Sequence, residues 1–315
     1  MSILVFLETD EGKVKKTSLE AVAFAQGMGG PVTAIAFGTA ALEELKSVGK
    51  YGAKKVLHAN NEAFNQGLIQ AYADVISKAM DETGATILVL ANSSLGTPVA
   101  ARVAAKQKAS LANNVVGLPD TNGGFKVKKS IYTGKAFATF DLKNEKKVIG
   151  IRKNAVELKE TDAEAEVSVL SAEAPIDATK ITSTEKATGD ILLAEAEIVV
   201  SGGRGMKGPE HWGVLEDLAK TLGAATGCSK PVSDMGWRPH HEHVGQTGVK
   251  VAPQLYVAVG ISGAIQHLAG VNSSKCIVVI NKDADAPFFK AADYGIVGDA
   301  FDVVPKLTEA IKQAQ

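Results

Sequence analysis

The chain has 315 residues, 45% of them hydrophobic and 22% charged, with a formal net charge of −1 at pH 7. This size and composition indicate a soluble protein with two domains, and the balanced charge argues against nucleic acid or an anionic membrane surface as a partner. No apolar run is long enough to span a bilayer, and the two cysteines, Cys228 and Cys276, form no CxxC motif. We expect a cytoplasmic bacterial protein without membrane insertion, disulfides or a metal site, or a mitochondrial matrix protein if a transit peptide has been removed.

The first half of the sequence alternates apolar runs with helix-like segments. Strands are predicted at 3–8, 31–37, 55–59 and 85–91, and helices at 17–29, 39–49, 65–82 and 97–107. In the last of these helices, Thr97 is the expected N-cap and Pro98 the first helical residue. Strand–helix alternation of this kind predicts a parallel sheet with right-handed crossovers.

The pattern changes between residues 115 and 170, where short strands follow one another. The segments 123–142 and 146–158 are expected to form hairpins at the edge of the sheet. The segment 159–190 is rich in Ala, Glu, Thr and Lys and predicts a connection between domains. We therefore expect an N-terminal α/β domain at 1–185 and a C-terminal domain at 186–315.

The second half returns to the strand–helix alternation. Residues 196–224 predict a strand, a glycine-rich turn and a helix that begins at Pro209, and two similar units follow at 255–268 and 275–311. The expected fold class is α/β, with a mainly parallel sheet flanked by helices in each domain. The C-terminal domain is Rossmann-like, although GGRGMKG (202–208) lacks the Gly-x-Gly-x-x-Gly fingerprint.

A tight glycine turn places Ser262 between the apolar run 255–259 and a helix-like stretch. Such a turn builds either the nucleophile elbow of a hydrolase or a cradle for an anion at a helix start. The elbow motif requires Gly where Ala264 stands, and the last histidine, His267, follows Ser262 by only five residues. The cradle is therefore favoured, and the hydrolase remains an alternative. The histidines of HHEH (240–243) lack the spacing of helical metal ligands and indicate a solvated loop.

Several other glycine-rich or polar turns follow apolar runs in the second half. They are Gly202–Gly205, 244–248, 280–283 and 298–301. A glycine pair beside Arg204 suits a phosphate that is approached by backbone N–H groups and a guanidinium. Each turn alone is a weak indication, but together they favour a nucleotide ligand at the carboxyl ends of the strands.

The stretch 244–307, preceded by SGGRG (201–205), resembles the alpha subunit of the electron-transfer flavoproteins, and the resemblance is specific across 196–307. It implies that the C-terminal domain binds FAD. By position it places Arg204 near the flavin and pyrophosphate, and Ser229 and Lys230 near the isoalloxazine. The remaining implied FAD contacts are Val244, Gly245, Gln246 and Thr247 against the flavin, Ser262, Gly263, Ala264, Ile265 and Gln266 along the pyrophosphate and ribityl chain, His267 at the flavin C2 carbonyl, and Asn281, Asp299 and Ala300 at the adenosine end. Lys230 departs from the family, which often has Arg there.

The resemblance also implies a function without catalytic residues. The chain would pair with a beta subunit and carry electrons from acyl-CoA dehydrogenases of fatty acid beta-oxidation to electron-transfer flavoprotein:quinone oxidoreductase at the membrane. His267 and Lys230 are expected to stabilise negative charge near N1 and the C2 oxygen of the reduced flavin. Two alternatives stay open: an electron-bifurcating relative that uses NADH through the partner's flavin, and a nucleotide-binding protein of the same fold without a redox role.

Overall fold

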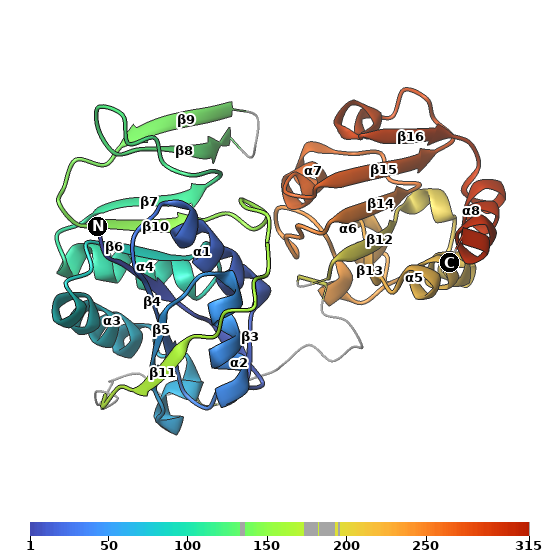
Figure 1. Ribbon diagram of the computed structural model, residues 1–315. Helices are drawn as coiled ribbons and strands as arrows, with labels where there is room; N and C mark the ends of the chain where they lie inside the picture. The colour runs from blue at the N-terminus through green and yellow to red at the C-terminus, as the bar shows by residue number, and fades with distance from the viewer. Residues whose placement is uncertain (133–135, 173–181, 183–192, 195, 315) are drawn as a thin grey trace. The chain divides into compact units, whose positions relative to one another are not determined.

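The computed structural model divides the chain into two units, Met1–Thr184 and Glu185–Gln315 (Figure 1). It describes all residues except 133–135, 173–181, 183–192, 195 and 315. The domain boundary expected near residue 185 therefore lies outside the described residues. Within the described part of the chain, no helix is long and apolar enough to cross a membrane.

The N-terminal unit is built on a nine-stranded sheet with the order β11-β5-β4-β1-β6-β10-β7-β8-β9. Neighbouring strands run parallel from β11 to β7, whereas β8 and β9 add an antiparallel hairpin at one edge. The strands are β1 (Ile3–Phe6), β4 (Val32–Phe37), β5 (Lys55–Ala59), β6 (Ile87–Ala91), β7 (Ser110–Val115), β8 (Lys126–Ile131), β9 (Ala136–Asp141), β10 (Lys147–Ile151) and β11 (Glu166–Val169). A separate antiparallel pair joins β2 (Thr9–Asp10) to β3 (Lys13–Val14).

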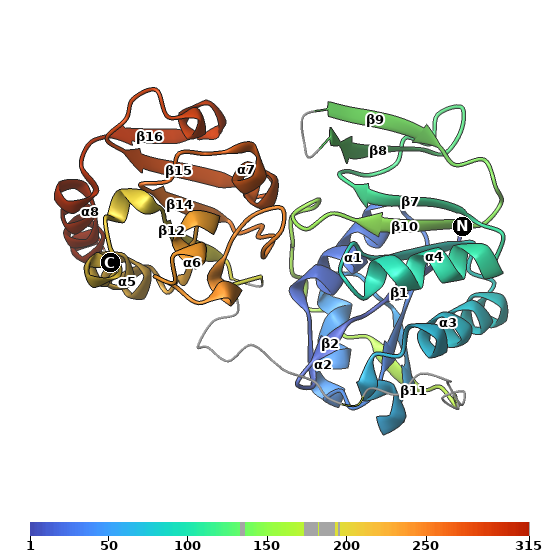
Figure 2. The ribbon, with the colours of Figure 1, turned by 180° about the vertical axis from the view of Figure 1, so that it is seen from behind.

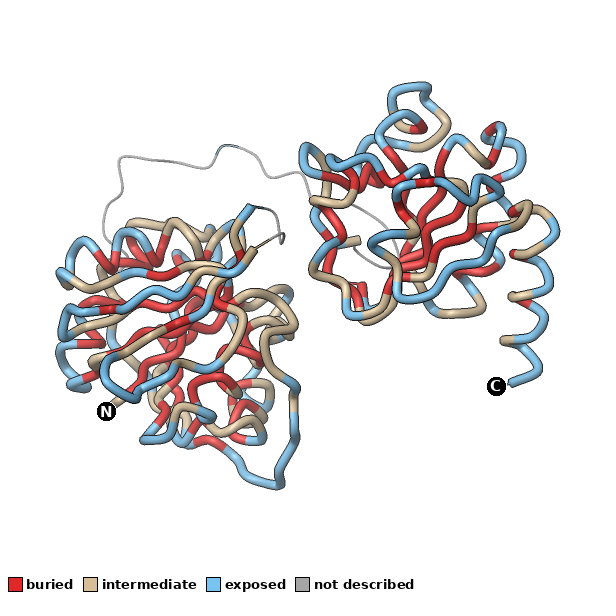
Figure 3. Tube along the Cα trace, turned by 90° about the horizontal axis from the view of Figure 1, so that it is seen from above, coloured by how far each residue is buried: buried red, intermediate tan, exposed pale blue. Residues whose placement is uncertain are grey.

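Helices cover both faces of this sheet, as Figure 2 shows from behind. Alternate residues of β1 enter different cores: Val5 packs with residues of α1 (Lys16–Gly27) and α2 (Leu42–Ser47), and Leu4 packs with residues of α3 (Ile69–Thr83) and α4 (Gly96–Lys106). A strand that is buried on both faces needs apolar residues at every position, which explains the unbroken run ILVF. Figure 3 shows the buried residues concentrated along the strands of both sheets.

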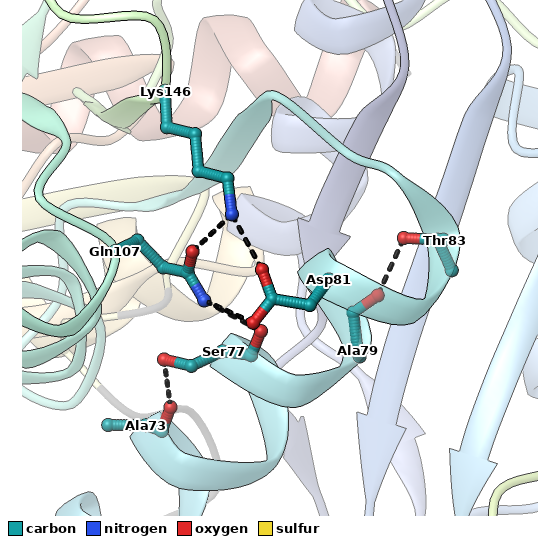
Figure 4. Close-up of polar contacts among 7 residues, drawn as sticks. All are labelled: Ala73, Ser77, Ala79, Asp81, Thr83, Gln107 and Lys146. Atoms are coloured by element: carbon teal, nitrogen blue, oxygen red, sulfur yellow. Dashed lines mark hydrogen bonds and ion pairs between the residues drawn. The ribbon is translucent and has the colours of Figure 1, made fainter.

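A polar cluster joins the end of α3, the residue after α4 and the residue before β10 (Figure 4). The Lys146 ammonium donates to Asp81 Oδ1 at 2.6 Å and to the side-chain carbonyl of Gln107. The Gln107 amide in turn donates to the Ser77 carbonyl at 2.8 Å and to Asp81 Oδ2 at 3.2 Å. The hydrogen bond from Lys146 lowers the pKa of Asp81 below its ordinary value. The cluster thus fixes the connection that places β10 in the sheet.

The C-terminal unit holds five parallel strands in the order β13-β12-β14-β15-β16. These are β12 (Ile198–Gly202), β13 (Ala225–Cys228), β14 (Leu255–Val259), β15 (Cys276–Asn281) and β16 (Tyr294–Val297). One face packs on α5 (Gly213–Leu222) and α8 (Ala300–Ala314), and the other packs on the segment that holds α7 (Ile265–Val271). A short helix, α6 (Lys230–Asp234), follows β13. The predicted α/β class is confirmed, and the strand order reverses between β12 and β14, where such sheets bind ligands.

Three local predictions are wrong. The strand β10 lies inside the sheet between β6 and β7, not at its edge, because the unbroken apolar run VIGI can be covered on both faces. The segment expected to be only a connection contributes β11, which pairs in parallel with β5. Thr97 is not an N-cap: α4 begins at Gly96, whose N–H donates to the Ser93 hydroxyl at 2.7 Å.

Candidate functional site

A cleft of about 790 Å³ opens at the carboxyl ends of the strands in the C-terminal unit. Its walls come from the turns after β12, β13, β14 and β15 and from the loop 243–247. The volume lies within the range of pockets that hold small molecules and cofactors. The cleft is therefore where the parallel sheet predicts a ligand, at the reversal of strand order.

Most of the residues predicted to bind a cofactor line this cleft. They are Arg204, Ser229, Lys230, Val244, Gln246, Thr247, Ser262, Ala264, Gln266, His267 and Asn281. Gly245, Gly263, Ile265, Asp299 and Ala300 are not among its lining residues. Ile265 is 62% exposed. Asp299 accepts a hydrogen bond from the Phe301 N–H at 3.0 Å, and Ala300 is the first residue of α8.

The glycines after β12 allow the turn that follows β12 to pack closely against the turn that follows β14. Gly203 N–H donates to the Val259 carbonyl at 2.8 Å, and Gly205 N–H donates to the Gly260 carbonyl at 3.0 Å. A Cβ on Gly203 would lie 2.1 Å from the Gly260 oxygen, which no side chain permits. The expectation that these two N–H groups approach a phosphate is wrong, because backbone carbonyls already accept from them. Arg204, between them, is exposed and lines the cleft.

The turn after β14 offers backbone donors instead. Gly260, with φ of +62°, and Gly263, with φ of +82°, allow the chain to turn sharply into α7. Gly263 must also be glycine because a Cβ would lie 2.5 Å from Phe288. Among the described residues, no hydrogen bond uses the backbone N–H groups of residues 262–266. These groups are available to an anionic ligand at the start of α7.

The loop 244–248 rests directly on α7. Gln246 N–H donates to the Gln266 carbonyl at 2.7 Å, and Gly245 contacts Gly270 so closely that a Cβ on Gly270 would lie 2.6 Å from the Gly245 Cα. Gly245 therefore seats the loop without lining the cleft. Gln246 and Thr247 are exposed on the cleft side of this loop, so both side chains are available to a ligand.

His267 is a buried, neutral imidazole on the cleft wall. It is 6% exposed, and its Nε2 lies 2.8 Å from the Tyr256 hydroxyl. Burial and, to a smaller extent, the neighbouring His243 lower the pKa of His267 to about 4. The Val244 backbone opposes this shift, but Nδ1 makes no hydrogen bond within the described part of the chain. At neutral pH His267 therefore contributes a hydrogen-bonding group and not a positive charge.

The segment HHEH (240–243), which was predicted to be a solvated loop, is exposed in its first half and buried in its second. His240 and His241 are exposed, whereas Glu242 is 8% and His243 only 2% exposed. Glu242 is buried because Arg238 binds both of its carboxylate oxygens, at 2.8 and 2.6 Å. His243 lines the cleft, and its Nδ1 is buried without a hydrogen-bond partner among the described residues. Sequence reasoning missed His243 because only the fold brings it under the loop 244–248.

The charged residues of the cleft favour an anion. Four cationic side chains line it, Arg204, Lys207, Lys230 and Lys282, against two carboxylates, Asp234 and Asp283. Lys207 also lies 3.6 Å from Asp299, and the Phe301 N–H together with this lysine lowers the pKa of Asp299. Lys282 and Asp283 follow the predicted Asn281, and the polar turn after the apolar run already indicated them, whereas Lys207 stands three residues after Arg204 and was not predicted.

The hydrolase alternative requires a histidine beside Ser262. His267 Nε2 is occupied by Tyr256, and no hydrogen bond in the described residues joins the Ser262 hydroxyl to a histidine. By contrast, the cleft is lined by four cationic side chains and has the unused backbone N–H groups of residues 262–266. It also has two buried imidazoles, each with a nitrogen that makes no hydrogen bond in the described residues. These features fit FAD, which combines a diphosphate with a flat ring system rich in hydrogen-bonding atoms.

Comparison with known proteins agrees with this geometry. The family model for the electron transfer flavoprotein FAD-binding domain matches residues 192–272, and the model for the electron transfer flavoprotein domain matches residues 3–176. The electron transfer flavoprotein subunit alpha of Mycobacterium tuberculosis is 41% identical over 98% of each chain. The same subunit of Pseudomonas aeruginosa is 39% identical over 99% of this chain and 100% of its own, and that of Bacillus subtilis 36% over 99% and 97%.

Proposed function

The chain belongs to the family of electron transfer flavoprotein alpha subunits, and on that basis we propose that it binds FAD in the cleft of its C-terminal unit and works as a heterodimer with a beta subunit. The heterodimer takes electrons from flavoprotein dehydrogenases, such as acyl-CoA dehydrogenases, and delivers them to a membrane quinone oxidoreductase. Because Cys228 and Cys276 are both free thiols, we place this heterodimer in a reducing compartment, the bacterial cytoplasm.

The observation that carries the proposal is the arrangement of polar groups around the cleft. The free N–H groups of residues 262–266 and the guanidinium of Arg204 suit the pyrophosphate, since both are donors that prefer an anionic oxygen. Asn281 donates to the Ile261 carbonyl at 3.0 Å and so holds the turn after β15 against the turn after β14. The proposal assigns Asn281 and Asp299 to the adenosine end of the ligand, Asn281 on the cleft wall and Asp299 outside its lining.

The residues assigned to the flavin ring come from three other segments. Ser229 and Lys230 follow β13, Gln246 and Thr247 lie on the loop seated on α7, and His267 belongs to α7 itself. When bound, the isoalloxazine supplies the redox chemistry, which none of the protein side chains can perform. The protein's part is to bind the ring, orient it and offer donors. Lys230 offers a positive charge and His267 a neutral donor to the pyrimidine side of the ring, where reduction adds negative charge.

The two imidazoles of the cleft are weakened as general bases, which fits a carrier of electrons. Burial lowers the pKa of both His243 and His267 below the ordinary value of histidine. The carboxylates of Asp234 and Asp283 also line the cleft, and the proposal assigns no proton transfer to them.

Flavin analysis of the co-purified heterodimer tests the proposal. We expect one FAD per heterodimer, lost when Arg204 and Ser262 are replaced together by Glu and Asp, whereas replacing Lys220 and Thr221 on α5 with the same two residues leaves the FAD in place. Two flavins, one of them reduced by NADH, would instead support an electron-bifurcating role. A colourless heterodimer that cannot be reconstituted with FAD would contradict FAD binding altogether.

A further inference from the structure

The hydroxyl of Tyr256 and the ring of His267 form a buried polar pair, with Ser201 near the hydroxyl and His243 near the ring. Tyr256 lies on β14 and is fully buried, and its Oη lies 2.8 Å from His267 Nε2 on α7. Their surroundings are apolar, with Phe288 in contact with both rings. The other imidazole nitrogen, Nδ1, is buried on a residue that lines the cleft and makes no hydrogen bond within the described residues. One nitrogen is thus held by the core, and the other lies near the Val244 backbone without a hydrogen bond among the described residues.

The hydrogen bond between Tyr256 Oη and His267 Nε2 holds one proton, which belongs either to the hydroxyl or to the ring. Burial keeps His267 neutral, so its ring carries one proton, on either Nδ1 or Nε2. Burial also raises the pKa of Tyr256, so the phenol keeps its proton. The pair therefore has two possible arrangements: Tyr256 donates to Nε2 and the ring proton is on Nδ1, or Nε2 donates to Oη and Nδ1 carries a lone pair.

The surroundings of Tyr256 decide between these arrangements. If Nε2 donated, the Tyr256 O–H would need another acceptor in a fully buried position. The Ser201 hydroxyl lowers the Tyr256 pKa, which is the effect of a group that donates towards Oη and not of one that accepts the phenol proton, and its oxygen accepts no hydrogen bond in the described structure. A buried O–H without an acceptor loses its hydrogen bond to water and gains none in return. The arrangement in which Tyr256 donates avoids this cost, because Nε2 then accepts.

We propose that Tyr256 is a positioning residue that fixes His267 in the tautomer with the proton on Nδ1, so that this N–H is a permanent donor for the ligand of the cleft. The inference rests on the proposed function for the identity of the acceptor, a carbonyl oxygen of the flavin ring. A neutral histidine without such a partner exchanges between tautomers and offers a donor only part of the time. In metal sites a carboxylate or carbonyl fixes the histidine tautomer by accepting from one ring N–H; here the hydroxyl fixes it by donating to Nε2, which leaves the proton on Nδ1.

Nitrogen NMR of the heterodimer with ¹⁵N-labelled histidine tests the proposal directly. The chain has six histidines, and the His267 signals are those that disappear in His267→Gln. We expect His267 at pH 7 with a protonated Nδ1 and an unprotonated Nε2. In Tyr256→Phe we expect this preference to be lost, with a mixture of tautomers or protonation on Nε2. The matched control is Tyr72→Phe, which removes the buried hydroxyl that donates to the Phe64 carbonyl in the N-terminal unit.

The midpoint potential of the bound flavin gives a second, independent result. We expect Tyr256→Phe to lower it while the FAD content stays unchanged, and Tyr72→Phe to leave both unchanged. A wild-type His267 with its proton on Nε2 would overturn the proposal, as would a Tyr256→Phe variant with the wild-type tautomer. A preparation without flavin would contradict the proposed function, but the tautomer measured on that same protein would still decide the role of Tyr256.

Discussion

The carbonyl oxygen of Gly260 accepts a hydrogen bond from the N–H of Gly205 at 3.0 Å and joins the turn after β12 to the turn after β14. Both turns border the cleft, and each approaches the other without any side chain between them. The geometry of the cleft therefore depends on backbone contacts that only glycine permits. This explains why a glycine-rich segment stands here without the Gly-x-Gly-x-x-Gly spacing.

Replacing Gly203 with alanine is expected to separate these two turns. A Cβ there would lie 2.1 Å from the Gly260 oxygen and 2.7 Å from its carbonyl carbon, both backbone atoms that cannot rotate away. We expect Gly203→Ala to lose several kcal/mol of unfolding free energy, as overpacked backbone contacts do, together with most of the bound FAD. Denaturant unfolding and flavin absorbance measure the two effects.

Gly213→Ala is the matched control for that experiment. Gly213 is the first residue of α5 in the same unit, and a Cβ there would contact nothing within 4 Å. Its unfolding free energy should stay within about 1 kcal/mol of wild type or rise slightly, because alanine favours helix. If both variants lost the same unfolding free energy, the contact of Gly203 with the Gly260 carbonyl would not be the reason for glycine at position 203.

His267 is expected to make the flavin-free protein less stable in mild acid. Its pKa falls from 6.5 in the unfolded chain to about 4 in the folded one, so between these values the unfolded chain binds more protons. The unfolding free energy therefore falls as the pH drops from 6.5 towards 4, by on the order of 3 kcal/mol from this residue. Denaturant titrations at stepped pH should show a shallower fall in His267→Gln.

His243 adds to the same trend, because burial also lowers its pKa, so some slope should remain in His267→Gln. His241→Gln, at an exposed position of the preceding loop, should keep the full wild-type slope. An unchanged slope in His267→Gln would mean that the folded protein protonates this imidazole as readily as the unfolded chain does.

The charge on Lys230 is expected to raise the flavin midpoint potential modestly. Lys230 is exposed beside the cleft, so solvent screens its charge, and the relevant interaction is near the 1 kcal/mol expected for two charges about 4 Å apart in water. At about 59 mV for each tenfold change, Lys230→Gln should lower the potential by roughly 40 mV. Lys230→Arg should stay near wild type because it keeps the charge.

Lys220→Gln serves as the control for a general loss of one positive charge, since Lys220 is exposed on α5 and does not line the cleft. Spectroelectrochemistry of the three variants compares the potentials. The same shift in Lys220→Gln and Lys230→Gln would attribute the effect to net charge and remove Lys230 from the site.

Arg238 holds the segment before His243 in place through two carboxylates of different burial. Glu242 receives two hydrogen bonds and its side chain is 11% exposed, whereas Glu216 receives one at 2.9 Å and is 50% exposed. We expect Glu242→Gln to lower the unfolding free energy by about 2 kcal/mol and Glu216→Gln by under 1 kcal/mol. Comparable losses would indicate that burial does not strengthen the Glu242 pair.

The strand–helix order was predictable because buried parallel strands require unbroken apolar runs, as in ILVF and ILVLA. The same rule, applied strictly, would have placed VIGI inside the sheet. The start of α4 at Gly96 was not predictable, because the Ser93 hydroxyl that accepts from the Gly96 N–H stands three residues earlier in an irregular turn. The edge strand β11 also escaped prediction, since Glu166–Val169 has little apolar surface of its own and depends on pairing with β5.

The cleft residues that stand together in short sequence motifs, such as VGQTG and GISGAIQH, were predictable. Properties that depend on which segments pack against each other were not. His243 is buried only because the loop 244–248 folds over it, and a sequence of exposed histidines gave no sign of that. The neutrality of His267 likewise follows from the depth of its burial, which the helical pattern alone does not reveal.

Anaerobic, stepwise reduction of the co-purified heterodimer, followed by visible absorbance, tests the central claim most directly. The account predicts one FAD per heterodimer that accepts its first electron to give a red, anionic one-electron-reduced form before full reduction. A flavin that passes straight to the two-electron-reduced form, or a heterodimer in which the cleft holds no flavin after reconstitution, would contradict it.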